Sequence, residues 1–309
     1  MQSIERELAT HRPVAPTLLT LGVFDGVHVG HLSLIRTLRE RAGSLGLMAG
    51  VVTFTPHPYE VLHPGERLPL LASLEERVQL LRQAGVPLVV PLTFTEEMSR
   101  SEPEQFVRLL TIHLKMSGML LGPDFALGRD RAGTLQSLEL LGRRMGFSVE
   151  AVPPLLINGQ VVSSTTIRTA LSTGDLDTAT RFLGRRFSLT GPVTSTSRRG
   201  ALLGFPTANL AIDPGRALPS DGVYVTIAHV SGKQYLSVTN IGRRPTFGET
   251  ERVVETHILD FRGSLYGDTL KVEFAARLRD ETPYPDREHL VAQIERDVAA
   301  ARRILGANE

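Results

Sequence analysis

Apolar runs alternate with amphipathic segments through the first half of the chain. The apolar runs predict buried strands at Thr17–Phe24, Met48–Phe54, Val86–Leu92 and Met119–Leu121. Apolar residues at helical spacing predict helices directly after Phe24 and near Leu74–Ala84, Pro103–Leu114 and Leu135–Met145. Strands that alternate with helices over this length indicate an α/β domain with a doubly wound parallel sheet.

The pattern changes after about Gly184, where strands follow one another without helices between them. The apolar runs are Val223–Val230, Gln234–Thr239, Val253–Phe261 and Thr269–Leu278, with turns rich in glycine and proline between them. Closely spaced strands of this kind predict an antiparallel β-barrel or sandwich. A charged segment, Asp286–Leu305, predicts a C-terminal helix. We therefore expect two domains, residues 1–184 and residues 185–309, with the second as a β-barrel.

Composition narrows the classes of partner. Lys and Arg number 34 against 33 Asp and Glu, so the chain lacks the broad basic field of a nucleic-acid-binding protein. The absence of cysteine excludes disulfides, thiolate zinc sites and cysteine nucleophiles. No apolar run approaches the roughly 20 residues that span a bilayer. We expect a cytoplasmic monomer or weak homo-oligomer that binds neither nucleic acid nor membrane.

The first candidate site follows the first predicted strand, at Asp25-Gly26-Val27-His28-Val29-Gly30-His31. Gly22, Gly26 and Gly30 allow tight turns and close approach of a ligand to the backbone. The following helix offers the positive end of its dipole to a phosphate, and His28 and His31 add imidazole donors. Histidines in turns or caps are the simpler alternative, which this placement between strand and helix disfavours. The P-loop pattern of Walker-type kinases is absent.

A second cluster lies at Ser163-Ser164-Thr165-Thr166-Ile167-Arg168, where four hydroxyl residues open a predicted helix. One hydroxyl suffices to cap a helix, and this is the alternative interpretation. Four hydroxyls with an arginine in the first turn favour a second anion clamp. Together the two clusters are expected to hold a triphosphate.

These residues resemble the FMN adenylyltransferase module of bacterial FAD synthetases, within the HxGH nucleotidyltransferase superfamily. The resemblance covers Gly22–His31, Thr53–Pro58, Gly122–Phe125 and Ser163–Arg168. It implies that ATP is bound by Gly22, Phe24, Asp25, Gly26, His28, Gly30, His31, Ser164, Thr165 and Arg168, with His28, His31 and Arg168 catalytic. It also implies that His57, Asp124 and Phe125 lie near the flavin. Ala126-Leu127 departs from the family, in which an Arg-Phe pair is common.

The chemistry of this half follows from charge. In the reaction that the resemblance implies, the phosphate of FMN attacks the α-phosphorus of ATP, and pyrophosphate leaves. The second pKa of a phosphate monoester is about 6, so the nucleophile is already an anion and needs no general base. The protein has to align two anions and stabilise the transition state, with Mg²⁺ accompanying ATP.

The second half resembles bacterial-type riboflavin kinases. Its motifs are Leu203–Leu210, which contains Pro-Thr-Ala-Asn, then Asp221–Tyr224, Asn240–Phe247 and Glu255–Phe261. The resemblance implies flavin contacts from Asn240, Arg243 and Arg244, and ATP contacts from Arg199 and Gly200. In the family a glycine-rich flap ending in Gly-Arg is usual before this motif. Here Thr196 and Ala201 replace a glycine and an arginine of that flap.

Phosphorylation of riboflavin starts from a neutral alcohol and therefore does need a base. Glu255, on a predicted strand at the barrel rim, is the candidate. Thr207 and Asn209 supply hard oxygen ligands for Mg²⁺ bound with ATP. The alternatives are a solvated strand carboxylate for Glu255 and an Asx-turn for Asn209.

The sequence thus predicts a bifunctional enzyme with riboflavin, FMN and ATP as ligands. FMN and FAD would be product and substrate rather than prosthetic groups. Two alternatives remain at this point. One is an FMN adenylyltransferase whose kinase half has weakened and mainly binds flavin, and the other is a non-catalytic sensor of flavin or nucleotide.

Overall fold

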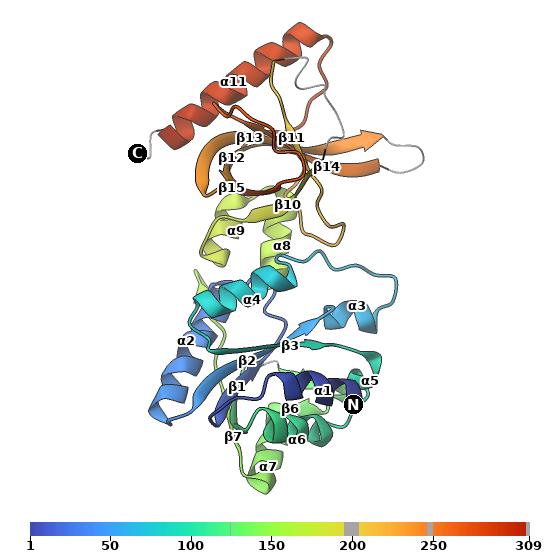
Figure 1. The fold of residues 1–309 in the computed structure, drawn as a ribbon, viewed down its shortest axis with the longest axis vertical. Coiled ribbons are helices and arrows are strands. Elements are labelled where there is room, and N and C mark those ends of the chain that lie inside the picture. The colour runs from blue at the N-terminus through green and yellow to red at the C-terminus, as the bar shows by residue number, and fades with distance from the viewer. Residues whose placement is uncertain (124, 195–203, 246–249, 307–309) are drawn as a thin grey trace. The chain divides into compact units, whose positions relative to one another are not determined.

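The computed structural model describes residues 1–123, 125–194, 204–245 and 250–306. The chain divides into two compact units, Met1–Ser164 and Thr165–Glu309, which are described separately below (Figure 1). By this division the helices α8 (Ser164–Thr173) and α9 (Leu176–Leu183) go almost entirely with the second unit. The domain boundary expected at residue 184 stays a prediction.

The first unit is built on a five-stranded parallel sheet, which confirms the predicted α/β class. The strand order is β3-β2-β1-β4-β7, and every neighbouring pair is parallel. The chain builds outward from β1 through β2 to β3, then returns to place β4 on the other side of β1. Ligands of such sheets bind beyond the carboxyl ends of the strands at this reversal. The strands are β1 (Thr17–Leu21), β2 (Met48–Thr55), β3 (Leu88–Thr93), β4 (Met116–Leu121) and β7 (Ser148–Ala151).

Helices cover both faces of this sheet (Figure 1). Leu18 packs in the core beneath α2 and α4, whereas its neighbour Leu19 packs in the core beneath α1, α6 and α7. Val51 and Val52 divide between the two cores in the same way. Because successive strand side chains point to opposite faces, a sheet covered on both sides reads as a continuous apolar run. The helices are α1 (Gln2–Thr10), α2 (Val29–Ser44), α4 (Leu74–Gln83), α6 (Pro103–His113) and α7 (Leu135–Met145).

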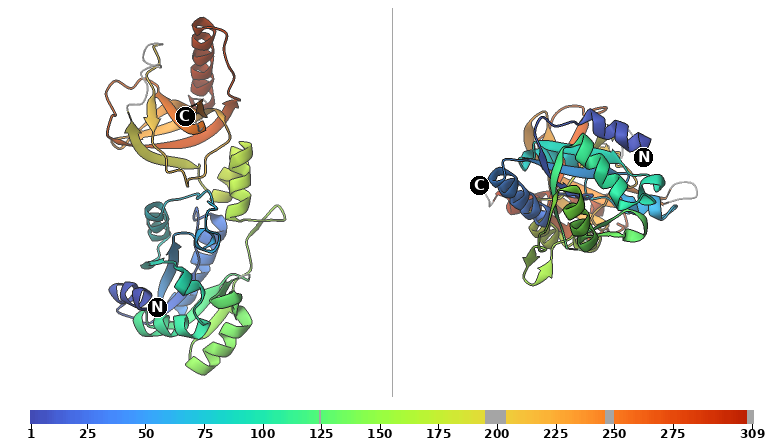
Figure 2. Two further views of the ribbon diagram at one scale, coloured as in Figure 1. Left: turned by 90° about the vertical axis from the view of Figure 1, so that its right-hand side faces the viewer. Right: turned by 90° about the horizontal axis from the view of Figure 1, so that it is seen from below.

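Short elements decorate the loops of the first unit. The β8–β9 hairpin stands away from the sheet in both views of Figure 2. The helical pieces are α3 (Pro58–Leu62), α5 (Glu96–Ser99) and the 3₁₀ turn η1 (Arg129–Arg131). The strand pieces are β5 (Ala126–Leu127), β6 (Gly133–Thr134), β8 (Leu156–Ile157) and β9 (Gln160–Val161).

The second unit is a closed antiparallel barrel, and its strand order is β10-β11-β14-β13-β12-β15. This confirms the β-barrel expected from the sequence, although the sequence analysis did not identify β10 or β11. A long helix, α11 (Arg287–Gly306), packs against β12 and β13. The strands are β10 (Ser188–Thr194), β11 (Ala208–Leu210), β12 (Gly222–Val230), β13 (Lys233–Pro245), β14 (Thr250–Ile258) and β15 (Thr269–Arg279).

A ladder of hydroxyl groups crosses the interior of the barrel. Thr226 on β12 lies 2.8 Å from Ser237 and 2.8 Å from Thr239, both on β13. Thr239 in turn lies 2.9 Å from Thr256 on β14. All four side chains are fully buried, so the ladder satisfies their polar atoms within the core.

Alternation along the strands sends the neighbouring residues to the outer face of the barrel. Val223, Val225 and Val238 lie on that outer face and form a core with Ala301 of α11. The outer face of β12 and β13 is therefore covered rather than exposed to water. Within the described part of the chain, no helix combines the length and apolar character needed to cross a bilayer.

Candidate active sites

The first candidate site lies in the turn that follows β1. The strand ends at Leu21, earlier than expected, because Phe24 adopts a left-handed backbone with φ of 56°. Gly26 and Val27 also have positive φ, at 77° and 40°. The turn closes with the Val27 N–H donating to Phe24 O at 3.0 Å, and α2 starts two residues later.

The two histidines of this turn stack on each other. His28 caps α2, and its Nδ1 accepts a hydrogen bond from the backbone N–H of His31 at 3.3 Å. The ring centroids are 3.6 Å apart at an interplanar angle of 15°. Burial, and then the proximity of His28, hold the pKa of His31 well below 6.5. His31 is therefore neutral at neutral pH, and its Nδ1 has no hydrogen-bond partner among the described residues.

The glycines of the turn leave room that a side chain would fill. A Cβ on Gly30 would lie 3.1 Å from the His28 ring and 3.3 Å from the carbonyl oxygen of Val162. A Cβ on Gly22 would lie 3.2 Å from the ring of Phe24, which is buried beneath the turn. The close packing explains why the motif uses glycine at these two positions.

The second sequence cluster reaches this turn through Ser164. Its Oγ donates to the backbone oxygen of Asp25 at 2.9 Å, so residues 139 positions apart in the chain meet. The helix α8 begins at Ser164, as expected from the hydroxyl run, and Thr165 and Arg168 follow within its first turns. The nucleotide contacts expected of Thr165 and Arg168 stay predictions.

Asp25 is fully engaged inside the first unit. Its side chain is buried, and its carboxylate accepts hydrogen bonds from the backbone N–H groups of Leu71 at 2.9 Å and Ala72 at 3.2 Å. The carboxylate therefore anchors the turn to the segment that leads into α4. The ATP contact expected of Asp25 stays a prediction.

An apolar cavity of about 570 Å³ opens at the carboxyl ends of β1 and β2. Gly22 and Phe125, two residues singled out from the sequence, both line it. His57 does not; it caps α3 by accepting from the N–H of Tyr59 at 3.1 Å, while its neighbour Pro58 lines the cavity. The size and apolar walls suit a planar ring system. Asp124 lies outside the described residues. The further lining residues include Phe54, Phe94, Met98, Phe106, Arg100, Arg129 and Arg131.

The second candidate site is a row of side chains across the barrel. Asn209 on β11, Glu255 on β14 and Asn240 on β13 lie directly opposite one another in register. Residues in register share a face of the sheet, so the three side chains stand together on the outer face. Glu255 and Asn240 line a cavity of about 750 Å³ between the barrel and α11, and Thr207 lines it as well.

Other walls of this cavity were missed by the sequence analysis. Glu281, in the loop after β15, accepts from Asn240 Nδ2 at 3.3 Å. Arg279 pairs with the buried Asp297 of α11, with Nη2 2.7 Å from Oδ2, and lies 5.7 Å from the centroid of the Tyr284 ring. These residues carry no motif signal, because Glu281 lies in the loop after the barrel and Arg279 contacts residues of that loop and of α11.

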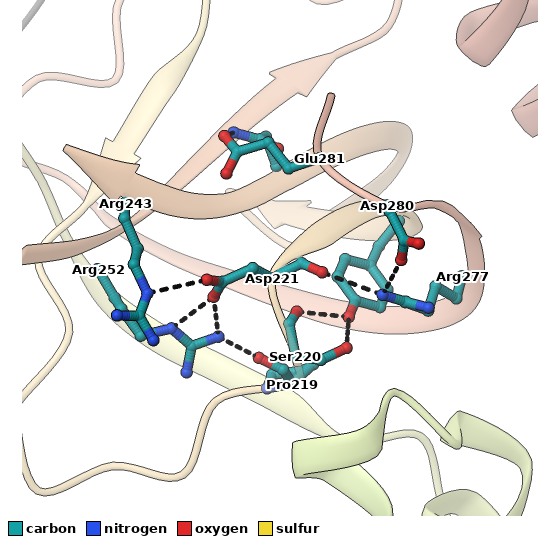
Figure 3. A network of polar contacts seen from close by, with 10 residues as sticks. Pro219, Ser220, Asp221, Arg243, Arg252, Arg277, Asp280 and Glu281 are labelled. Carbon is teal, nitrogen blue, oxygen red and sulfur yellow. Dashed lines mark hydrogen bonds and ion pairs between the residues drawn. The ribbon is translucent and has the colours of Figure 1, made fainter. Parts of the chain in front are cut away.

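Arg243 takes part in a polar network centred on Asp221 (Figure 3). Its Nε donates to the carboxylate of Asp221 at 3.1 Å, and the opposite residue Arg252 donates to the same carboxylate at 2.8 Å (Figure 3). Arg277 donates to the backbone oxygen of Asp221 at 3.0 Å and to Asp280. Arg243 is not among the residues that line the cavity. Its flavin contact stays a prediction.

Three further expectations cannot be placed. Arg199 and Gly200, with the rest of the flap Ser195–Ala201, lie outside the described residues. The side chain of Arg244 likewise lies outside the described part of the chain.

Comparison with known proteins agrees with this division of sites. A family model described as FAD synthetase matches residues 11–166, and one described as riboflavin kinase matches residues 183–305. A crystal structure described as a macrolide-efflux protein from Streptococcus pneumoniae superposes with a TM-score of 0.87 at 28% identity, covering 95% of this chain and 96% of that chain.

Two relatives of the same name match nearly the whole chain. The bifunctional riboflavin kinase/FMN adenylyltransferase of Pseudomonas fluorescens is 39% identical, with 92% of each chain covered. The protein of the same name from Bacillus subtilis is 34% identical over 94% of this chain and 92% of that protein. The chain therefore belongs to the family of bifunctional riboflavin kinase/FMN adenylyltransferases.

Proposed function

We propose that this chain makes FAD from riboflavin in two ATP-dependent steps, with one step in each half. The barrel phosphorylates riboflavin to FMN, and the α/β unit transfers the adenylyl group of ATP to FMN. The observation that carries the proposal is the row Asn209–Glu255–Asn240, of which Glu255 and Asn240 line a cavity of about 750 Å³, in a chain that also contains the stacked histidine turn.

In the kinase half, Glu255 is the proposed base. Its carboxylate takes the proton of the primary hydroxyl of riboflavin as the oxygen attacks the γ-phosphorus of ATP, and ADP leaves. The outward orientation of Glu255 toward the cavity supports this role. Asn240, beside it in register, is proposed to contact the flavin, together with Arg243 and Arg244.

Thr207 and Asn209 are the proposed holders of Mg²⁺ that arrives with ATP. Hydroxyl and amide oxygens are ligands of the hard kind that this ion accepts, and Mg²⁺ is usually bound by few protein groups plus phosphates. Among the described residues, no cluster of three or more His, Asp or Glu side chains could hold a metal by itself. The ion would supply positive charge to the phosphates.

In the adenylyltransferase half, a phosphate oxygen of FMN attacks the α-phosphorus of ATP. The bond to pyrophosphate breaks, and no proton needs to be removed. His28, His31, Ser164 and Arg168 are proposed to hold the triphosphate, with the turn glycines allowing close approach. Phe125 lines the apolar cavity beside this turn, which supports flavin binding there. His57 and Asp124 are proposed to contact the flavin as well.

A single assay tests both activities. The purified chain is incubated with riboflavin, ATP and Mg²⁺, and flavins are separated by chromatography over time. FMN should appear first and FAD later, and FAD should also form from supplied FMN. Failure of the protein to convert either substrate would refute the corresponding half of the proposal.

A further inference from the structure

The turn that presents the two histidines is strained. Phe24 and Val27 are not glycine, yet both have left-handed backbone conformations, with φ of 56° and 40°. For a β-branched residue such as Val27 this conformation is a genuine outlier. Strained residues of this kind persist only where the surrounding structure over-determines them. Contacts with the surrounding structure must therefore hold this turn in its strained conformation.

A buried arginine supplies one set of these contacts. Arg77 of α4 is only 2% exposed. Its Nη1 lies 2.6 Å from the carbonyl oxygen of Val23 and 3.2 Å from that of Phe54. It also lies 3.3 Å from Thr53 Oγ1, which itself donates to Val23 O at 2.8 Å. One guanidinium thus joins the segments that follow β1 and end β2.

Burying a cation costs free energy, so a buried arginine is expected only where its hydrogen bonds offset that cost. Burial lowers the pKa of Arg77, and the negative charge of Asp25 acts in the opposite direction. Arginine nonetheless stays protonated in proteins. The charge strengthens its hydrogen bonds to the carbonyl oxygens.

Asp25 makes the reciprocal connection. Its carboxylate accepts from the N–H groups of Leu71 and Ala72, which directly precede α4. Asp25 therefore bonds the turn to the segment before α4, and Arg77 bonds α4 to the residue that precedes the turn.

We propose that Arg77 is a positioning residue for adenylyl transfer, which holds the Val23–Val27 turn in the geometry that presents His28 and His31. The proposal rests on the adenylyltransferase function proposed above. Arg77 is buried beneath the turn and acts through it rather than on ATP. Val23 and Phe54, whose carbonyl oxygens Arg77 binds, also line the apolar cavity. The same guanidinium therefore fixes both the histidine turn and part of the cavity wall.

The test compares Arg77→Gln and Arg77→Lys in the full-length chain. The matched control is Arg82→Gln, because Arg82 is an exposed arginine on the same helix. The kcat and the KM for ATP are measured for FAD formation from FMN. Riboflavin phosphorylation in the same sample reports on the other unit, and hydrogen exchange of the peptide covering residues 22–31 reports on the turn.

For Arg77→Gln we expect a fall in kcat of about 10²-fold, since misplacing catalytic groups by about 1 Å costs that much. The kinase rate should change little, exchange in residues 22–31 should accelerate, and any rise in the KM for ATP should be smaller than the fall in kcat. Arg77→Lys should regain part of the kcat, because it keeps the charge but not the planar fork. Arg82→Gln should match the parent.

Two results would overturn the inference while leaving the proposed function intact. One is Arg77→Gln with the parent kcat per folded molecule. The other is a loss that disappears once the folded fraction is restored by cooling. If Arg77→Gln does not fold, Arg77→Lys decides: a reduced kcat for FAD formation at the parent kinase rate supports the inference, and the parent kcat overturns it. A parent protein that forms no FAD refutes the adenylyltransferase function itself.

Discussion

Glu255 on β14 lies directly opposite Asn209 on β11, so the proposed base and a proposed magnesium ligand stand side by side on the outer face of the barrel. The two residues are 46 positions apart in the chain and come together only because β11 pairs with β14 rather than with the next strand. If the proposed roles hold, proton removal and phosphate neutralisation take place at neighbouring positions. Substitutions at the two positions should have different effects.

Glu255→Gln keeps the shape of the side chain but cannot accept the proton of riboflavin. FMN formation should fall by roughly 10²–10⁴-fold, the usual contribution of a general base. FAD formation from supplied FMN should be unchanged, because its nucleophile is already ionised. Single-turnover phosphoryl transfer is the measurement, and a parent rate in the chemical step would exclude Glu255 as the base.

Asn209→Ala removes an oxygen ligand and leaves Glu255 in place. The Mg²⁺ concentration that gives half-maximal FMN formation should rise, since fewer protein oxygens remain for the ion. The Mg²⁺ dependence of FAD formation should stay as in the parent, which provides the internal control. An unchanged requirement in both reactions would remove Asn209 from the proposed site.

His31→Ala and Arg168→Ala should each slow FAD formation by about 10²–10³-fold, as expected for loss of one preorganised donor. Riboflavin phosphorylation should persist in both variants. Arg181→Ala is a suitable control, because Arg181 is an exposed arginine of the neighbouring helix α9. Equal loss of both activities in folded protein would contradict separate sites.

The stability of the first unit should depend on pH through His31. Its pKa is lowered in the folded state, so between that value and 6.5 the unfolded chain binds more protons than the folded one. Stability is therefore present above about pH 6.5 and is lost as the pH falls below it. His31→Gln should lose less stability than the parent between pH 7.5 and 5, by denaturant titration. Parallel curves over this range would show that His31 does not titrate differently on unfolding.

Asp297→Asn should weaken the wall of the kinase cavity. Asp297 is nearly buried, at 6% side-chain exposure, and breaking a buried ion pair costs roughly 3 kcal/mol or more. The KM for riboflavin should rise with the loss of stability. Asp280→Asn is the control: its carboxylate also pairs with an arginine but is 79% exposed, so the cost should be at most about 1 kcal/mol. Equal effects of the two substitutions would contradict a special role for burial.

Local sequence signals predicted many of the helices and strands, because the caps and apolar spacing that define these elements lie within their own residues. The helix α7 runs from Leu135 to Met145 as expected, with a Thr134 cap at its start and a left-handed Gly146 at its end. The strands β7, β10 and β11 were missed. β7 and β11 have only four and three residues, and the apolar pattern of β10 is interrupted by Gly191 and Pro192. The expected strand end at Phe24 was wrong by three residues, since apolar character does not reveal a left-handed backbone.

The residues of the candidate sites show the same distinction between local and distant signals. Motif residues such as His28, His31 and Glu255 could be named from the sequence, because the chemistry demands those residue types. The supporting residues could not. Arg77 meets Val23 across 54 positions, and Arg279 meets Asp297 across a loop into α11, so nothing local marks either arginine.

The hydroxyl ladder inside the barrel has a consequence for the proposed kinase site. Thr239 and Thr256 point inward, while the adjacent Asn240 and Glu255 point outward. A slip of one residue between sheet faces would exchange the two sets, because side chains alternate strictly. It would place the Glu255 carboxylate in the sealed interior, which is costly, and would remove the hydroxyl ladder from the core. The hydroxyl ladder in the core therefore favours the strand register in which the proposed base, Glu255, lies on the outer face beside the cavity.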